Sequence, residues 1–395
     1  MFVYADNAAT TPMSKAAKER MTECINSVYG NPSSLYSVGQ SARETLETAR
    51  REIAECIGAD TKEVYFTSGG SEADNQAIVS AAHLGARRGK KHIISTKFEH
   101  HAVLHTLEAL EKQGFKVTLL DVHSDGIVRP EEVKAAITDE TALVTVMFAN
   151  NEIGTVQPIA KIGEICRRHG VIFHTDAVQA AGHIKIDVKA QNIDMLSVSA
   201  HKFHGPKGIG ILYAKSGIPL ENIIYGGAQE RGRRAGTENV PAAAAMAAAL
   251  TEQNSRLCRN AEYVSALRDR LIEGLSKIPH SVLNGDRERR LPGTVNMCFE
   301  GIEGESLLLL LDDKGIEASS GSACTSGSLD PSHVLLALGL PHEVAHGSLR
   351  LSLSEYNTAE EIEYIIKTVP EVVSYLRNMS PVWEELENGT RKHVL

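Results

Sequence analysis

The chain has 395 residues, of which 42% are hydrophobic and 23% charged. This length is enough for two or three domains with real cores, and the composition excludes a disordered, collagen-like or coiled-coil protein. With 41 Lys and Arg against 50 Asp and Glu the net charge is −9. Nucleic acid and anionic membrane surfaces are therefore not expected as partners, because both attract basic surfaces.

The sequence predicts no membrane span, signal peptide or disulfide framework. The longest apolar stretch, residues 240–250, is about half of the ~20 residues that a membrane helix needs. The first dozen residues lack a basic region followed by an apolar core. The six cysteines show no CxxC spacing, which is typical of a reducing compartment, so we expect a cytoplasmic protein.

Short apolar runs alternate with segments of helical spacing through the first half of the chain. The runs predicted as strands are residues 64–67, 92–95, 116–120, 142–148, 171–173 and 195–198. Between them, Val103, Leu107 and Leu110 recur at i, i+4 and i+7, which indicates a helix, as does the spacing of isoleucines in 159–165. This alternation predicts an α/β fold with a mostly parallel sheet covered by helices on both faces.

The pattern changes after about residue 241. An alanine-rich helical stretch leads to leucines at helical spacing in 267–275, and a further apolar set begins at residue 294. Near the end, Thr358 and Glu361 form a capping box ahead of an amphipathic helix. We predict a large α/β domain over residues 14–257 and a smaller α+β domain over residues 258–395, which residues 1–13 join.

Four of the predicted strands end in unusual polar clusters. In sequence letters these are TSGGSE at 67–72, ANNE at 149–152, HTDAVQ at 174–179 and SAHK at 199–202. Ligands in open α/β sheets bind outside the carboxyl ends of the strands. The four clusters should therefore line one crevice.

The cluster at 67–72 is a glycine-rich turn that leads into a helix, so its backbone amides can hold a phosphate. An ordinary connection would look the same. The turn lacks both the GxGxxG spacing and a Gly-Lys-Ser/Thr ending, so neither a dinucleotide nor a Walker-type nucleotide site is indicated.

Lys202 is either a solvated loop lysine or a nucleophile that forms an imine with a carbonyl compound, and Lys207 is its rival. Asp176 either caps the next helix or pairs with a buried cation. A lysine imine, a phosphate cup and an aspartate beside a protonated ring nitrogen together describe a pyridoxal phosphate site. No single residue indicates this cofactor, but the set does.

Cys324 differs from the other five cysteines, which lie in apolar surroundings typical of a protein core. It falls in residues 318–328, where no side chain is larger than threonine or cysteine, so we expect a mobile surface loop. A working Cys324 would need a nearby cation or base to raise its thiolate fraction.

Two further positions have open alternatives. Arg350, on a predicted strand, is either a surface arginine or a bidentate clamp on a carboxylate. His100 and His101 open a helix, and adjacent histidines point to different faces, so a shared metal is not expected; one of them could stack on an aromatic ligand.

Eight motifs carry a resemblance to a known family. They are DNAATT at 6–11, GNPSS at 30–34, EH at 99–100, NNEIGT at 150–155, HTDAVQ at 174–179, SAHK at 199–202, RRAGTEN at 233–239 and SGSACTSGS at 320–328. The chain resembles, nearly end to end, the NifS/IscS cysteine desulfurases, which belong to the class V aminotransferase group of fold-type I pyridoxal phosphate enzymes. The stretch around Cys324 is similar to the long loop of group I desulfurases rather than the shorter SufS-like loop.

The resemblance implies pyridoxal 5'-phosphate as the cofactor. Lys202 would form the imine and later move the Cα proton, Asp176 would keep the ring nitrogen protonated, and His100 would stack on the ring. The remaining cofactor contacts that it implies are Gln179 to the ring hydroxyl, Asn151, and the phosphate ligands Gly70, Ser71, Ser199 and His201, joined by Thr237 from the other subunit of a homodimer.

For the substrate, the resemblance implies L-cysteine, with its carboxylate held by Asn151 and Arg350. Cys324 would take the sulfur, which leaves alanine and an enzyme persulfide for an acceptor such as an iron–sulfur scaffold protein. No catalytic metal is implied, although Cys324 could contact an iron–sulfur cluster transiently. Ser71, Ala228 and Glu355 depart from the commonest family pattern, and an acidic residue at 355 could change partner docking.

Two alternatives stay open. Within the same fold, a selenocysteine lyase or another class V aminotransferase-type enzyme would share most of these residues. From a different class, a non-enzymatic sulfur or metal carrier could use Cys324 and the 16 histidines.

Overall fold

A computed structural model of the chain describes residues 1–320 and 331–395. Its main sheet has seven strands in the order β2-β8-β7-β6-β5-β3-β4. Their bounds are β2 Val64–Thr67, β3 His92–Thr96, β4 Lys116–Leu120, β5 Thr141–Thr145, β6 Ile172–Asp176, β7 Met195–Ser199 and β8 Gly210–Ala214. Only β8 runs antiparallel to its neighbours, so the predicted α/β class and mostly parallel sheet are confirmed.

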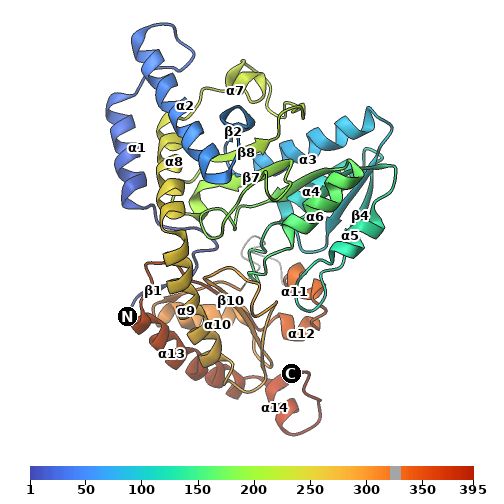
Figure 1. Cartoon of the computed structure of the whole chain (residues 1–395). Coiled ribbons are helices and arrows are strands. Elements are labelled where there is room, and N and C mark those ends of the chain that lie inside the picture. The colour runs from blue at the N-terminus through green and yellow to red at the C-terminus, as the bar shows by residue number, and fades with distance from the viewer. Residues whose placement is uncertain (321–330) are drawn as a thin grey trace.

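Helices cover both faces of this sheet (Figure 1). Ile93 packs with helices α3 and α4, whereas the next residue, Ile94, packs on the other face with α2, α6 and α8. Neighbouring strand residues point to opposite faces, so a buried parallel strand needs apolar residues in succession. The helices of this part are α1 Lys15–Ser27, α2 Ser37–Ile57, α3 Gly70–Ala86, α4 His101–Glu111, α5 Pro130–Ala136, α6 Ile159–His169, α7 Gln229–Gly232 and α8 Val240–Ser255, with short 3-10 turns at Thr61–Glu63 and Ala200–Lys202.

A second core lies around a three-stranded antiparallel sheet in the order β12-β10-β9, with bounds Ser348–Ser352, Thr294–Phe299 and Ser281–Leu283. The helices here are α9 Leu257–Leu275, α10 Gly304–Asp313, α13 Ala359–Asn378 and α14 Pro381–Glu387. The N-terminal strand β1, Val3–Tyr4, pairs in parallel with β11, Ile316–Glu317, and Val3 is buried in this core. The capping box is confirmed, because Thr358 and Glu361 exchange hydrogen bonds between side chain and backbone.

Two short helices, α11 His333–Ala337 and α12 His342–Ala345, pack on the core of the large sheet although they follow β11 in the chain. The core position expected for Cys258 is wrong, because this residue is exposed on a solvent-facing turn of α9. Cys56 is half-buried. Within the described residues, none of the helices has the length and apolar character that crossing a membrane would require.

Candidate active site

A pocket of about 380 Å³ lies at the carboxyl ends of β5, β6 and β7. Ten of the predicted site residues line it: Gly70, Ser71, His100, Asn151, Asp176, Gln179, Ser199, His201, Lys202 and Arg350. Thr237 is exposed and does not line the pocket of its own chain, and Cys324 lies outside the described residues. The rival lysine, Lys207, is exposed and lies outside the pocket.

Lys202 ends the 3-10 turn that follows β7, and its side chain enters the pocket. Its Nζ donates hydrogen bonds to the main-chain oxygens of Ala8 and Ala9, each at 2.7 Å. The N-terminal segment thus supplies acceptors for the ammonium group. Gln179 binds the same segment, because its Nε2 donates to Ala8 O at 2.9 Å.

Asp176 is the last residue of β6, and its Oδ1 accepts from the backbone N–H of Val178 at 2.9 Å. Burial raises the pKa of this carboxyl to about 6, although the Val178 N–H and the Lys202 ammonium pull it down. Asp176 is therefore mainly ionised at neutral pH, and a buried carboxylate favours a cationic or N–H partner.

The first turn of α3 faces the pocket through Gly70 and Ser71, and no side chain caps its N-terminus. A Cβ added at Gly70 would lie 2.6 Å from Val178 Cγ2, so a larger residue would fill this cradle. Burial lowers the pKa of the neighbouring His201 to about 4, which keeps its imidazole neutral at pH 7. Bare amides at a helix N-terminus bind anions.

His100 is the N-cap of α4, where its Nδ1 accepts from Ala102 N at 3.1 Å. Burial and the Lys202 charge lower the pKa of His100 to about 4. The ring is therefore neutral at pH 7, and its proton lies on Nε2 because Nδ1 is an acceptor.

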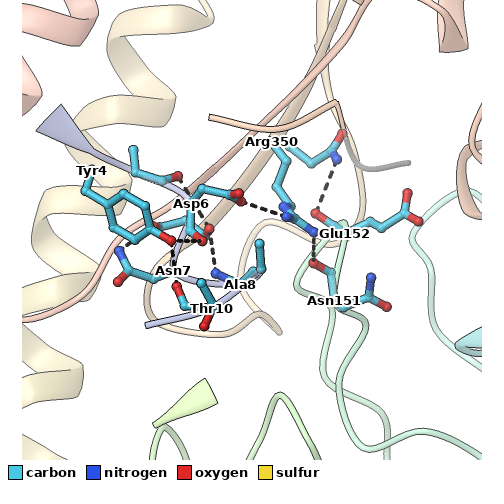
Figure 2. A network of polar contacts seen from close by, with 12 residues as sticks. Tyr4, Asp6, Asn7, Ala8, Thr10, Asn151, Glu152 and Arg350 are labelled. Carbon is cyan, nitrogen blue, oxygen red and sulfur yellow. Dashed lines mark hydrogen bonds and ion pairs between the residues drawn. The ribbon is translucent and has the colours of Figure 1, made fainter. Parts of the chain in front are cut away.

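Arg350 on β12 joins three parts of the chain at one side of the pocket (Figure 2). Its Nη2 lies 2.7 Å from Asp6 Oδ1, and its Nη1 donates to Asn151 O at 3.0 Å. The surface alternative for Arg350 is wrong, because the side chain is only 3% exposed. Its buried Nε has no hydrogen-bond partner among the described residues, so a donor remains for a carboxylate.

Sequence reasoning missed several residues at this site. Asp74 lines the pocket one helical turn after Ser71, and its buried Oδ1 has no hydrogen-bond partner in the described part of the chain. That i, i+3 spacing could have identified it. Asp6 was noticed only as part of a motif. Ala8 and Ala9 bind Lys202 through main-chain oxygens, which every residue has, so the sequence could not single them out.

The aminotransferase class-V family model matches residues 3–365. The chain belongs to this family. Among curated relatives, a cysteine desulfurase IscS from Clostridium botulinum is 53% identical over 386 residues, which cover 97% of each chain. A cysteine desulfurase IscS from Methanosarcina thermophila is 53% identical over 380 residues, 96% of this chain and 94% of the relative.

Solved structures give the same result for this class-V family member. A NifS-like protein superposes with a TM-score of 0.89 at 38% identity and covers 95% of this chain and 100% of its own. A structure described as SspA in complex with cysteine has a TM-score of 0.79 at 36% identity, covering 90% and 100%. The resemblance to the NifS/IscS desulfurases is thereby confirmed.

Proposed function

We propose that this chain is a cysteine desulfurase that uses pyridoxal 5'-phosphate to remove sulfur from L-cysteine. The observation that carries the proposal is the convergence of Lys202, Asp176 and Arg350 in one pocket at the sheet edge. A primary amine, a buried carboxylate and a buried guanidinium match the aldehyde, the ring nitrogen and the substrate carboxylate that such a reaction brings together.

The residues present fit the cofactor. Asp176 is a buried carboxylate that feels the Lys202 charge but forms no ion pair within the described residues, and a protonated ring nitrogen would satisfy it. The cradle at Gly70 and the uncapped amides of α3 would hold the phosphate with Ser71, Ser199 and neutral His201. Gln179 and Asn151 would complete the contacts, and the neutral ring of His100 can lie against an aromatic face.

When bound, the cofactor would supply an electron sink for the bonds at the substrate Cα. Arg350 and Asn151 would hold the substrate carboxylate and fix the amino acid's orientation. Lys202, beside the substrate, would take and return the Cα proton at Nζ, and His100 Nε2 would carry a further proton at the rim. Asp176 would keep the proton on the ring nitrogen.

Cys324, which lies outside the described residues, would attack the substrate sulfur as a thiolate. The Cβ–S bond would break, its electron pair would stay on the three-carbon fragment, and protonation of that fragment would give alanine. The enzyme persulfide would pass to an acceptor such as an iron–sulfur scaffold protein. We place this chemistry in the reducing cytosol, a proposal supported by the five free cysteines of the described chain.

We further propose a homodimer in which Thr237 reaches the phosphate of the neighbouring pocket. Thr237 is exposed in the loop after α7 and lies away from its own pocket, which supports a role between subunits. Glu230 in α7 anchors this loop, because its carboxylate binds the buried Arg50 at 2.7 and 2.8 Å.

The test is alanine and sulfide production from L-cysteine by the reconstituted protein under reducing conditions. Cys324→Ala should lower sulfide release by at least ~100-fold, since it removes the nucleophile. It should keep the visible absorbance of the cofactor, and borohydride should fix that cofactor on Lys202. Cys258→Ala, which removes an exposed thiol on α9, is the matched control and should stay active.

Sulfide release by Cys324→Ala at the wild-type rate would refute the desulfurase reaction. Activity with selenocysteine but not cysteine would favour the lyase. A colourless protein that carries stoichiometric metal would favour a carrier.

A further inference from the structure

A buried histidine and a half-buried glutamate form an ion pair just outside the pocket. His204 follows Lys202 by two residues, and its side chain is 0% exposed. Its Nε2 lies 3.3 Å from Oε2 of Glu355, the residue at which this chain departs from the family pattern. Glu355 Oε1 also accepts from Gln253 Nε2 on α8 at 2.6 Å. Glu355 therefore faces inward and links its own segment, three residues after β12, to α8 and to the Lys202 loop.

The hydrogen bonds of the His204 ring determine its protonation. Nδ1 lies 2.9 Å from Pro12 O, and because a carbonyl only accepts, Nδ1 must carry a proton. A neutral ring would then point the lone pair of Nε2 at the Glu355 carboxylate, and two acceptors at 3.3 Å repel. Nε2 lies within ion-pair distance of Glu355 but is not aligned for a hydrogen bond. Burial raises the pKa of Glu355, but the His204 ring and the hydrogen bond from Gln253 outweigh burial and lower it to about 2. The proton between the two groups therefore belongs to the ring.

His204 is also bound through its backbone to the segment that holds Lys202. Its N–H donates to Thr11 Oγ1 at 2.8 Å, and its oxygen accepts from Ser14 N at 2.9 Å. The same N-terminal segment provides the oxygens that Lys202 Nζ binds. His204 has a φ of 65°, a left-handed conformation that non-glycine residues adopt at a cost, so surrounding contacts must hold it there.

We propose that the His204–Glu355 ion pair positions Lys202 for its part in the proposed reaction. This inference rests on the desulfurase function proposed above. Other titratable or charged groups near the pair are His183, which donates from Nε2 to Lys202 O at 2.9 Å, and Tyr356, whose ring lies 4.9 Å from that of His204. Glu252 on α8 and Arg256, the residue after that helix, form their own pair at 2.9 Å.

The test uses Glu355→Gln, His204→Asn and the double variant. Gln keeps the shape of Glu and loses the charge, whereas Asn tolerates a left-handed φ and retains a donor for Pro12 O. The matched control is Glu363→Gln, which removes an exposed ion pair with Arg270 on the surface of the small domain. All four variants and the wild type are measured with and without cofactor.

Without cofactor at pH 6, each single variant should lower Tm by about 3 °C, and the double variant should fall no further than either single one. With cofactor, Glu355→Gln should lower kcat about tenfold through misplacement of Lys202, with little change in KM, since Arg350 is untouched. Glu363→Gln should change neither quantity.

Two results would overturn the proposal: additive Tm effects, or normal kcat in a variant whose Tm has fallen. The last result would make the pair structural only. The wild type could lack desulfurase activity while the Tm losses of the two single variants remain non-additive. The proposed function and the positioning role would then both be refuted, whereas the ion pair would still be supported by the Tm measurements without cofactor.

Discussion

Glu152 offers a quantitative test of how burial tunes a carboxyl beside the pocket. It follows Asn151, is 5% exposed, and accepts a hydrogen bond from Ser332 Oγ at the N-cap of α11. Burial raises the pKa of Glu152 to about 7, although Ser332 and Arg350 act to lower it. In an unfolded chain a glutamate titrates near ~4.3, so the folded protein holds a proton that the unfolded chain has already released.

The sign and size of the effect follow from this difference. The folded state binds more protons between pH ~4.3 and ~7, so Glu152 makes stability fall as the pH rises through that window. At about 1.36 kcal/mol per pH unit, the two units from pH 5 to 7 amount to at most about 2.7 kcal/mol, with little change above pH 7. Gln has the same shape and still accepts from Ser332 but cannot ionise. The free energy of unfolding of Glu152→Gln, relative to wild type, should therefore rise by about 2 kcal/mol between pH 5 and pH 8.

Urea unfolding of the protein without cofactor at pH 5, 6, 7 and 8 measures this difference. Burial also raises the pKa of Glu99, to about 8, and that of Asp176, to about 6. Both residues are present in both proteins, so their titration cancels. Glu131→Gln, at an exposed acid on α5, is the control and should give a curve parallel to the wild type. If the free energy of unfolding of Glu152→Gln also runs parallel to that of the wild type from pH 5 to pH 8, the argument from burial is refuted.

Two further variants test buried ion pairs. Asp6→Asn removes the charge partner of Arg350 and should lower the free energy of unfolding by about 3 kcal/mol. Sodium acetate supplies a carboxylate and should raise the Tm of this variant more than that of the wild type. Equal Tm shifts in both proteins would argue against a carboxylate site at Arg350. Arg50→Lys cannot keep both bonds to Glu230 and should cost about 2 kcal/mol in urea unfolding, whereas unchanged stability would mean that one bond is enough.

Local patterns in the sequence were sufficient for six of the seven strands of the large sheet and for part of the pocket, but the predicted runs did not include β8. Four of the predicted strands end where an apolar run meets a polar cluster, so Asp176 and Lys202 could be placed at the same sheet edge before the fold was known. Residues 146–148 were predicted to extend the strand at 141–145. They leave it, yet Val146 and Phe148 still donate to backbone oxygens of β6. Apolar character identifies such buried extended segments but not the residue at which regular pairing stops.

Contacts between distant segments could not be predicted. Asp6 and Arg350 are 344 positions apart, and either one alone is an ordinary charged residue. Glu355 was interpreted as a possible docking residue because its position is often basic in the family. Its inward orientation becomes visible only once α8 and the Lys202 loop bring Gln253 and His204 against it. Pairing of this kind depends on the tertiary fold, which sequence periodicity does not encode.

The N-terminal segment stabilises two cations at the pocket, the half-buried Lys202 ammonium and the buried Arg350 guanidinium. Oxygens of Ala8 and Ala9 bind the Lys202 ammonium. The Asp6 carboxylate, two residues before Ala8, binds the Arg350 guanidinium (Figure 2). Unpaired, each cation would carry a desolvation cost of several kcal/mol at ε values typical of a protein interior. Because one short segment holds both groups, and β1 anchors it to the second core through β11, the pocket depends on the two cores being assembled together. A shift of that segment would move the amine and the carboxylate clamp in concert, which couples the geometry of cofactor attachment to that of substrate binding.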